Sequence, residues 1–134
     1  MNSFDVVVDF VRSTQTLNKD LFEYLIDDDC EIEYKFDGIE SGTINKEEYV
    51  SRLVKGHFNN TIYVDVKKLT IEKDVYDGNE IFVVEEIANF TRRGSGKNED
   101  GPGIYRMEST GILRLNNNKI IYMSYEFNKN KLDE

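Results

Sequence analysis

The order of the periodic segments constrains the fold more than any other feature of this sequence. Apolar residues recur at helical spacing through much of the first half, and long runs with the two-residue spacing of strands fill almost all of the second half. Turn signals at Asp77-Gly78 and Asn116-Asn117-Asn118 divide the second half into hairpins. This order predicts an α+β fold in which helices pack against one strongly curved antiparallel sheet.

Three helices are expected in the first half of the chain. The first begins after Ser3 and the second, shorter one near Asn18, each with a single apolar stripe. A third helix is expected after Asn45, because Asn45 and Glu48 have the spacing of an N-terminal capping pair. The apolar stripe of this third helix runs through His57, the only histidine in the chain.

The strand-like segments predict a bent sheet. Cys30 to Phe36 is expected to be a strand, because apolar and aromatic side chains alternate with charged ones. Asp37 to Thr43 is interpreted as a loop. The alternation from Ile62 to Ile71 changes phase near Lys67-Lys68, which predicts a β-bulge that bends the sheet. Two further strands are expected at Ile104 to Leu115 and Lys119 to Asn128.

The strand from Glu80 to Thr91 is apolar on both faces, so both are expected to be covered. We expect Ile81, Val83 and Ile87 to face the helices, with Glu85 between them. The convex face of the sheet would then carry an apolar patch, through which we expect a homodimer to form. The residues expected in that patch are Phe82, Val84, Ala88, Phe90 and Ile112.

The segment from Arg92 to Gly103 is rich in glycine and holds the only proline of the chain, so a long mobile connection is expected there. Such a connection at one end of the sheet is either a lid or contact loop, or a hairpin tip without a role.

Composition and charge exclude several classes of protein. The chain has 134 residues, 39% of them hydrophobic and 12% aromatic, which fits one domain over residues 1–134. A formal net charge of -9 argues against nucleic acid, whose binding depends on Lys and Arg. No apolar run reaches the roughly 20 residues that span a membrane, and the first residues, which include Asp5 and Asp9, are not expected to form a secretion signal. Cys30 is the only cysteine, which fits a reducing, cytoplasmic location.

Three segments carry a resemblance to a known superfamily. Leu25 to Glu33 is similar to an L-F-x-D-D-A-x-[VI]-E pattern, Ser41 to Glu47 to S-G-x-x-x-[GK]-x, and Leu113 to Ile121 to F-R-[VF]-x-x-G-K-I-V. On these segments the chain resembles the superfamily of nuclear transport factor 2, ketosteroid isomerase and the SnoaL-like polyketide cyclases. The resemblance implies a cone-shaped α+β barrel whose interior can hold a small molecule.

The catalytic positions implied by that resemblance are not matched. The isomerases need a hydroxyl donor, a carboxylate base and a protonated carboxyl group, and the corresponding positions in this chain are Phe10, Tyr34 and Gly111. The acid of the SnoaL-type cyclases also falls on Gly111, and the positions of the related epoxide hydrolases fall near Ser124 and Tyr125. Glu33, beside Tyr34, is the nearest carboxylate to the base position.

Two residues are candidates for acid/base chemistry. Glu85 would lie in the cone between apolar neighbours, where a carboxyl group has a raised pKa; alternatively Glu86 faces inward, or Glu85 pairs with Arg106. His57 on the third helix could act near neutral pH, or could be a hydrogen-bonded structural histidine or an exposed one at the helix end. The residues expected to line the ligand site are Phe10, Tyr34, Val83, Tyr105, Ser109 and Tyr122.

The leading functional hypothesis is a cone that binds a small, mostly apolar molecule, with or without a simple cyclase, isomerase or dehydratase step. The alternative is a non-catalytic dimeric interaction module, whose acidic surface from Asp27 to Glu33 would suit a basic partner. No cofactor is expected. A metal site is not expected either, because one histidine and one cysteine far apart form no recognisable ligand set.

Overall fold

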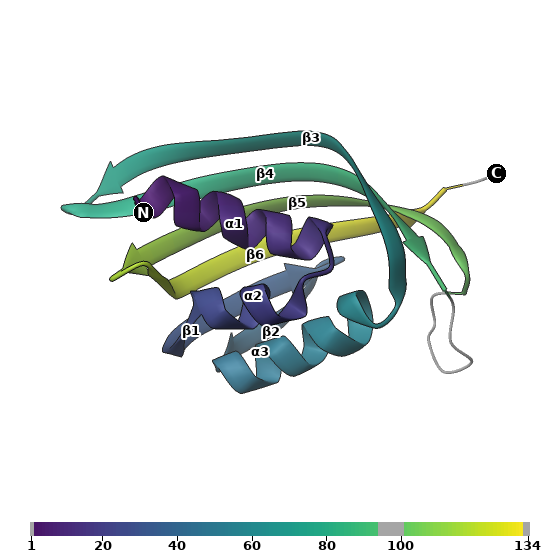
Figure 1. Ribbon diagram of the computed structural model, residues 1–134, viewed down its shortest axis with the longest axis horizontal. Coiled ribbons are helices and arrows are strands. Elements are labelled where there is room, and N and C mark those ends of the chain that lie inside the picture. The colour runs from purple at the N-terminus through teal and green to yellow at the C-terminus, as the bar shows by residue number, and fades with distance from the viewer. Residues whose placement is uncertain (1, 94–100, 133–134) are drawn as a thin grey trace.

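The computed structural model describes residues 2–93 and 101–132. These residues form helices α1 (Ser3–Gln15), α2 (Lys19–Leu25) and α3 (Lys46–Leu53), with a π-helical turn η1 (Val54–Phe58) that continues α3. The strands are β1 (Ile26–Phe36), β2 (Ile39–Ile44), β3 (Thr61–Tyr76), β4 (Asn79–Arg92), β5 (Gly103–Asn116) and β6 (Lys119–Lys131). The helices lie in the hollow of one curved sheet (Figure 1). The α+β prediction is therefore confirmed.

The six strands are ordered β2-β1-β6-β5-β4-β3. Every neighbouring pair is antiparallel except β1 and β6, which run parallel, so the sheet is mixed rather than purely antiparallel as expected. The parallel pair arises because the chain reaches β6 only after the β3–β4–β5 meander, which places the last strand beside the first (Figure 1). Hereafter the concave face is the one that meets the helices, and the convex face is the opposite one.

Each α-helix begins at an asparagine. The side-chain oxygens of Asn2, Asn18 and Asn45 accept hydrogen bonds from backbone N–H groups three residues later, at 2.9, 3.2 and 2.9 Å. The expected cap of the first helix, Ser3, is instead its first residue. The Asn45 cap is confirmed.

The turn η1 is wider than an α-helical turn, and its backbone is closed by the Asn59 N–H bonding to the Val54 carbonyl at 2.9 Å. This turn buries His57 and Phe58 against the sheet. The Phe58 ring centroid lies 5.1 Å from that of Phe22, which also stacks on Phe10 at 5.1 Å. These stacked rings join the turn after α3 to helices α1 and α2.

The predicted bulge in β3 is confirmed. The pairing with β4 shifts between Val66 and Lys68, so that Val64 lies opposite Phe90 and Leu69 lies opposite Glu86. The extra residue keeps the apolar side chains before and after it on the concave face.

The predicted orientation of β4 is wrong. Phe82, Val84, Ala88 and Phe90 are buried on the concave face, and Ile81, Val83 and Ile87 lie half-buried on the convex face. Both sets are apolar, so a two-residue period cannot distinguish the faces. The concave set contains both phenylalanines, which fill the larger space beneath the helices.

The segment expected to be a loop contains β2. Asp37 and Gly38 have φ of 48° and 86° and form a tight turn that pairs Phe36 with Ile39. Asp-Gly at 37–38 is the same hairpin signal as at 77–78, where φ is 53° and 79°. The turn before β2 was therefore visible in the sequence. The strand itself was not, because β2 is short and largely exposed and so lacks an alternation of apolar and polar residues.

The connection expected to be mobile lies mostly outside the described residues, since β4 continues to Arg92 and β5 starts at Gly103 while residues 94–100 are not described. Within residues 2–93 and 101–132, no helix has both the length and the apolar composition to cross a bilayer.

Candidate functional site

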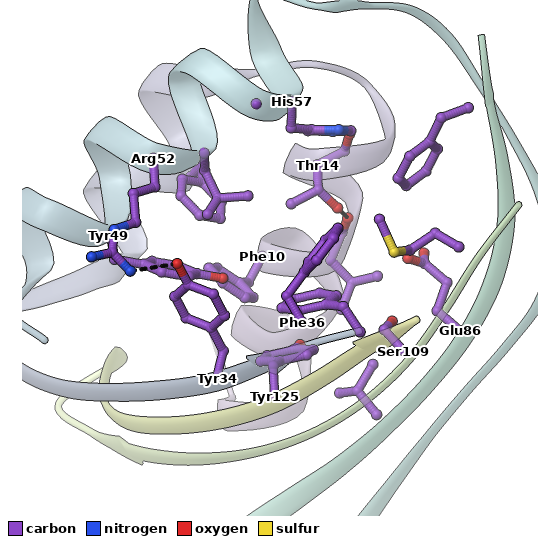
Figure 2. A pocket seen from close by; sticks show the side chains of 18 of the residues that line it. Phe10, Thr14, Tyr34, Phe36, Tyr49, Arg52, His57, Glu86, Ser109 and Tyr125 are labelled. Atoms are coloured by element: carbon purple, nitrogen blue, oxygen red, sulfur yellow. Dashed lines mark hydrogen bonds between the residues drawn. The ribbon is translucent and has the colours of Figure 1, made fainter. Parts of the chain in front are cut away.

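A cavity of about 190 Å³ lies between the helices and the concave face (Figure 2). This volume is smaller than the roughly 300–1,000 Å³ of clefts for drug-sized ligands, and slightly larger than a cavity of about 150 Å³ that holds benzene. The cavity therefore has room for a ligand built on about one ring. Its walls are mainly aromatic and aliphatic and include Phe10, Phe22, Phe36, Val84, Phe90 and Phe127.

Polar side chains reach this cavity from several elements of the fold. They are Thr14 from α1, Tyr34 from β1, Tyr49 and Arg52 from α3, His57 from η1, Glu86 and Arg92 from β4, Ser109 from β5 and Tyr125 from β6. The predictions that Phe10, Tyr34, His57 and Ser109 lie in one place agree with this geometry. Elements far apart in the sequence meet at the cavity because the sheet curves around the helices (Figure 1).

Glu86 places a carboxyl group in the cavity wall. Its Oε2 accepts a hydrogen bond from Nε2 of Gln15 at 2.5 Å, and Ser109 lies opposite it on β5. Burial raises the pKa of Glu86, and the hydrogen bond from Gln15 offsets part of that rise. Of the two adjacent glutamates that the sequence could not separate, Glu86 is the one that faces inward.

Three predicted site residues lie on the other side of the sheet. Glu85 is exposed opposite Thr110, and Val83 lies opposite Ile112, both on the convex face. The Tyr122 hydroxyl donates to Glu33 Oε1 at 2.6 Å on that same face. The prediction that these residues line the cavity is wrong, and for β4 the reason is the inverted alternation described above.

Tyr105 was also predicted to line the ligand site; it is buried on the concave face opposite Phe90 but does not line the cavity. Its hydroxyl donates to the Gly101 carbonyl at 2.7 Å. This hydrogen bond joins the first residues of β5 to the segment that precedes the strand.

His57 has both ring nitrogens engaged. Nε2 lies 2.7 Å from the Thr14 carbonyl, which can only accept, so Nε2 carries the proton. Nδ1 then accepts from the Thr61 hydroxyl at 3.3 Å. Burial lowers the pKa of His57 to about 4, so the imidazole is neutral at physiological pH. This geometry matches the structural alternative for His57 rather than a base.

At Gly111, where the resemblance places the acid of the isomerases and cyclases, the ring of another residue takes the space of a side chain. A Cβ at Gly111 would lie 2.3 Å from the Cε1 and Cζ atoms of Tyr125, so the Tyr125 ring occupies the space of a side chain there. The ring also stacks on Phe127 at 5.2 Å. Burial raises the pKa of Tyr125 well above its ordinary value, and its hydroxyl therefore stays protonated.

The other polar residues of the cavity have only weak signals in the sequence. Arg52 lies four residues after Glu48, which is the spacing of a helical ion pair. Arg92 falls at the start of the expected loop, yet its guanidinium is buried, donates to the Gly56 carbonyl and lies 5.3 Å from the Phe90 ring centroid. Tyr49 and Tyr125 carry no local pattern that separates them from other core aromatics.

No group of three His, Cys, Asp or Glu side chains among the described residues is arranged to hold a metal ion. No protein-family model matches the sequence. A search of curated proteins also finds no match.

Several solved structures share the fold. AusH from Aspergillus nidulans has a TM-score of 0.72 at 12% identity, over 93% of this chain and 82% of its own. A putative polyketide cyclase from Pseudomonas putida has a TM-score of 0.72 at 12% identity, over 93% and 90%. An epoxide hydrolase of LEH-like type from M. tuberculosis has a TM-score of 0.62 at 17% identity, over 93% and 81%. An NTF-2 like protein from Burkholderia xenovorans has a TM-score of 0.60 at 11% identity, over 98% and 87%, and the chain shares this nuclear transport factor 2-like fold.

Proposed function

We propose that the cavity binds a small, mostly apolar molecule of about one ring, and that Glu86 performs a simple acid/base step on it. The observation that carries this proposal is a carboxyl group set in a cavity wall that is otherwise mainly apolar. Ligand sites of this type combine apolar walls with a few polar groups that orient the ligand.

The chemistry open to Glu86 follows from its surroundings. Burial raises the pKa of the Glu86 carboxyl group, which makes its carboxylate a stronger base than an exposed one, and the same group can return the proton that it takes. Gln15 holds one of its oxygens and fixes the orientation of the other. A cyclase, isomerase or dehydratase step needs little more than such a group, and the similarity in fold to a polyketide cyclase and an epoxide hydrolase supports this class.

The test measures exchange of hydrogen for deuterium next to the carbonyl group of a cyclic ketone, such as cyclohexanone, in heavy water. In this reaction Glu86 takes a proton from carbon, the electron pair moves to the carbonyl oxygen, and a deuteron returns to carbon. We expect the wild type to accelerate exchange and Glu86→Gln to lower the rate by roughly 10²- to 10⁴-fold.

Glu85→Gln is the matched control, because Glu85 is the adjacent residue on the convex face. Its exchange rate should equal that of the wild type. Equal rates in all three proteins would reject Glu86 as the acid/base group. Failure of cyclic ketones and phenols to bind would reject the ligand site itself and favour the interaction module, with the exposed acids Asp28 and Asp29 as its surface.

The proposal also includes a homodimer that forms through the convex face and a cytoplasmic location. Ile81, Val83, Ile104 and Ile112 support the first, because they leave aliphatic surface on a face that no described helix covers (Figure 1). Cys30 supports the second, since a single cysteine can form no intrachain disulfide, which fits a reducing compartment.

A further inference from the structure

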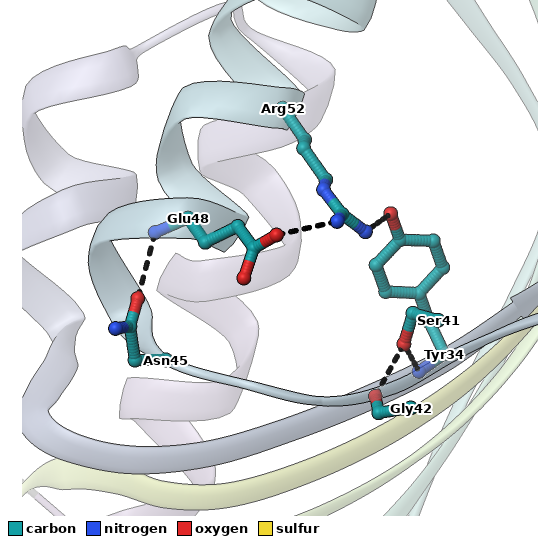
Figure 3. Close-up of polar contacts among 6 residues, drawn as sticks. All are labelled: Tyr34, Ser41, Gly42, Asn45, Glu48 and Arg52. Atoms are coloured by element: carbon teal, nitrogen blue, oxygen red, sulfur yellow. Dashed lines mark hydrogen bonds and ion pairs between the residues drawn. The ribbon is translucent and has the colours of Figure 1, made fainter.

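The backbone at Tyr34 interrupts the ladder between β1 and β2. Glu33 pairs with Thr43 and Lys35 pairs with Glu40, so Tyr34 lies opposite two residues, Ser41 and Gly42, in a β-bulge. The Ser41 hydroxyl accepts a hydrogen bond from the Tyr34 N–H at 3.0 Å and donates to the Gly42 carbonyl at 2.6 Å (Figure 3). The extra residue lies on β2, and Tyr34 faces the cavity together with Phe36 through the regular alternation of β1.

The hydroxyl of Tyr34 is held from the helix side. Arg52 Nη1 donates to it at 2.6 Å, and Arg52 Nη2 pairs with Glu48 Oε1 at 2.5 Å (Figure 3). The Glu48 N–H bonds to the Asn45 side chain at the start of α3. A chain of contacts therefore runs from the helix cap to the phenol and holds the guanidinium beside the Tyr34 hydroxyl.

The direction of these hydrogen bonds decides what the phenol can do. A guanidinium only donates, so the Tyr34 oxygen is the acceptor and its own proton is left to be donated. A cation on the oxygen polarises the O–H bond and strengthens that second hydrogen bond. Tyr34 and Arg52 both line the cavity, and Figure 2 shows them on the opposite side of it from Glu86.

We propose that the Tyr34 hydroxyl, polarised by Arg52, donates a hydrogen bond to a ligand oxygen that carries full or developing negative charge, such as a phenolate or an enolate. This inference rests on the proposed ligand site and names the substrate class for it: a monocyclic compound whose oxygen becomes anionic. Glu86 and Tyr34 then act on two parts of the same ligand, one exchanging a proton and the other holding the charge that results.

The probe for this test is 4-nitrophenol, whose phenolate form is coloured and whose single ring fits the cavity volume. Absorbance titration gives the pKa of the bound phenol, and chemical-shift changes at cavity residues locate it. We expect the wild type to bind the phenolate roughly tenfold more tightly than the neutral phenol. The cavity tyrosines Tyr49 and Tyr125 do not titrate with the probe, because burial raises their pKa values.

Tyr34→Phe and Arg52→Gln should each abolish the preference for phenolate, and Arg52→Lys should restore part of it. Tyr122→Phe and Arg106→Gln are matched controls on the convex face and should leave it unchanged. Arg52 is exposed, so its variants keep the test decisive even where Tyr34→Phe does not fold.

The outcomes separate the two proposals. Binding of 4-nitrophenol with the same preference in the wild type, Tyr34→Phe and Arg52→Gln would overturn the role of the Tyr34–Arg52 pair and leave the ligand site standing. Absence of any binding of phenols and cyclic ketones to the wild type would overturn both. Loss of the preference in the cavity variants alone supports the inference.

Discussion

His57 joins three segments of the fold through one imidazole ring. Its Nε2–H bonds to the Thr14 carbonyl near the end of α1, and its Nδ1 accepts from Thr61 at the start of β3. The ring also lies 5.0 Å from the Phe90 ring on β4. Burial disfavours a charged imidazole at this place, so the folded state favours the neutral ring that joins α1, η1 and β3.

The first prediction concerns the protonation of His57. The folded pKa of about 4 lies below the ordinary 6.5, so as pH falls the unfolded chain binds the proton first. The contribution to stability is present above pH 6.5 and is lost as pH falls to about 4, by an amount on the order of 3 kcal/mol. NMR titration of an untagged chain measures this directly, because the sequence holds one histidine.

His57→Gln is the comparison for the stability measurement, since glutamine cannot titrate. Between pH 6.5 and 4 the free energy of unfolding of the wild type should fall more steeply than that of His57→Gln. A measured pKa near or above 6.5 would contradict a buried, neutral imidazole that accepts a hydrogen bond from Thr61.

The sequence does not resolve all the residues of the site, because a shift of one residue along a strand exchanges the side chains on its two faces. Glu85 and Glu86 are adjacent, so a shift of one position in the alternation moves a carboxyl group from the cavity to solvent. Phe10, Tyr34 and Ser109 were predicted, because their own strands or helix have one clearly apolar face. Gln15, Arg52 and Arg92 were not, because their roles come from partners 71, 18 and 36 residues away.

At the scale of elements, the bulge between β1 and β2 depends on a backbone conformation that favours glycine. Gly42 has φ of +70°, and a Cβ built on it would contact nothing within 4 Å. The constraint is therefore conformational and not steric crowding by neighbours. Ser41, the residue before it, supplies the oxygen that binds the Tyr34 N–H, so the bulge of β2 is anchored to the backbone of β1 at Tyr34.

We predict that Gly42→Ala destabilises the fold by about 1–2 kcal/mol, the cost of a left-handed conformation for a residue with a Cβ. Urea unfolding monitored by circular dichroism measures it. Gly56→Ala is the matched control: its Cβ also contacts nothing within 4 Å, and its φ lies outside the left-handed range. The control should be neutral or slightly stabilising. Equal losses in both variants would show that the bulge has no special conformational requirement.

Element type and order were largely predictable, because long amphipathic patterns and Asp-Gly turns act locally. The bulge in β3 was predictable for the same reason, since a change of phase in the alternation is visible in the sequence. The parallel pairing of β1 with β6 was not, because it joins segments about ninety residues apart and leaves no local pattern. The π-helical turn from Val54 to Phe58 was also missed, since its spacing departs from the helical period.

At the scale of the whole molecule, the described helices pack against only one of the two faces of the sheet. The helices bury the concave face, and the described helices leave the convex face open (Figure 1). On β4 and β5 the convex face combines aliphatic side chains with charged residues of both signs, including the Arg106–Glu108 pair at 3.6 Å. A patch of this composition suits a two-fold contact with a second copy, because each charge can meet its opposite across the axis.

The last prediction is the assembly state. If two chains pair through the convex face, sedimentation equilibrium at micromolar concentration should give twice the chain mass of 15.6 kDa. Ile112→Asp should dissociate the dimer without unfolding the chain, because Ile112 is 41% exposed on that face.

Ile39→Asp is the matched control, since Ile39 is 76% exposed beside the turn before β2, and this variant should remain dimeric. Phe90→Asp should unfold the chain instead, because Phe90 is buried beneath the helices. A monomeric wild type, or an Ile112→Asp variant that stays dimeric, would reject the convex face as the interface.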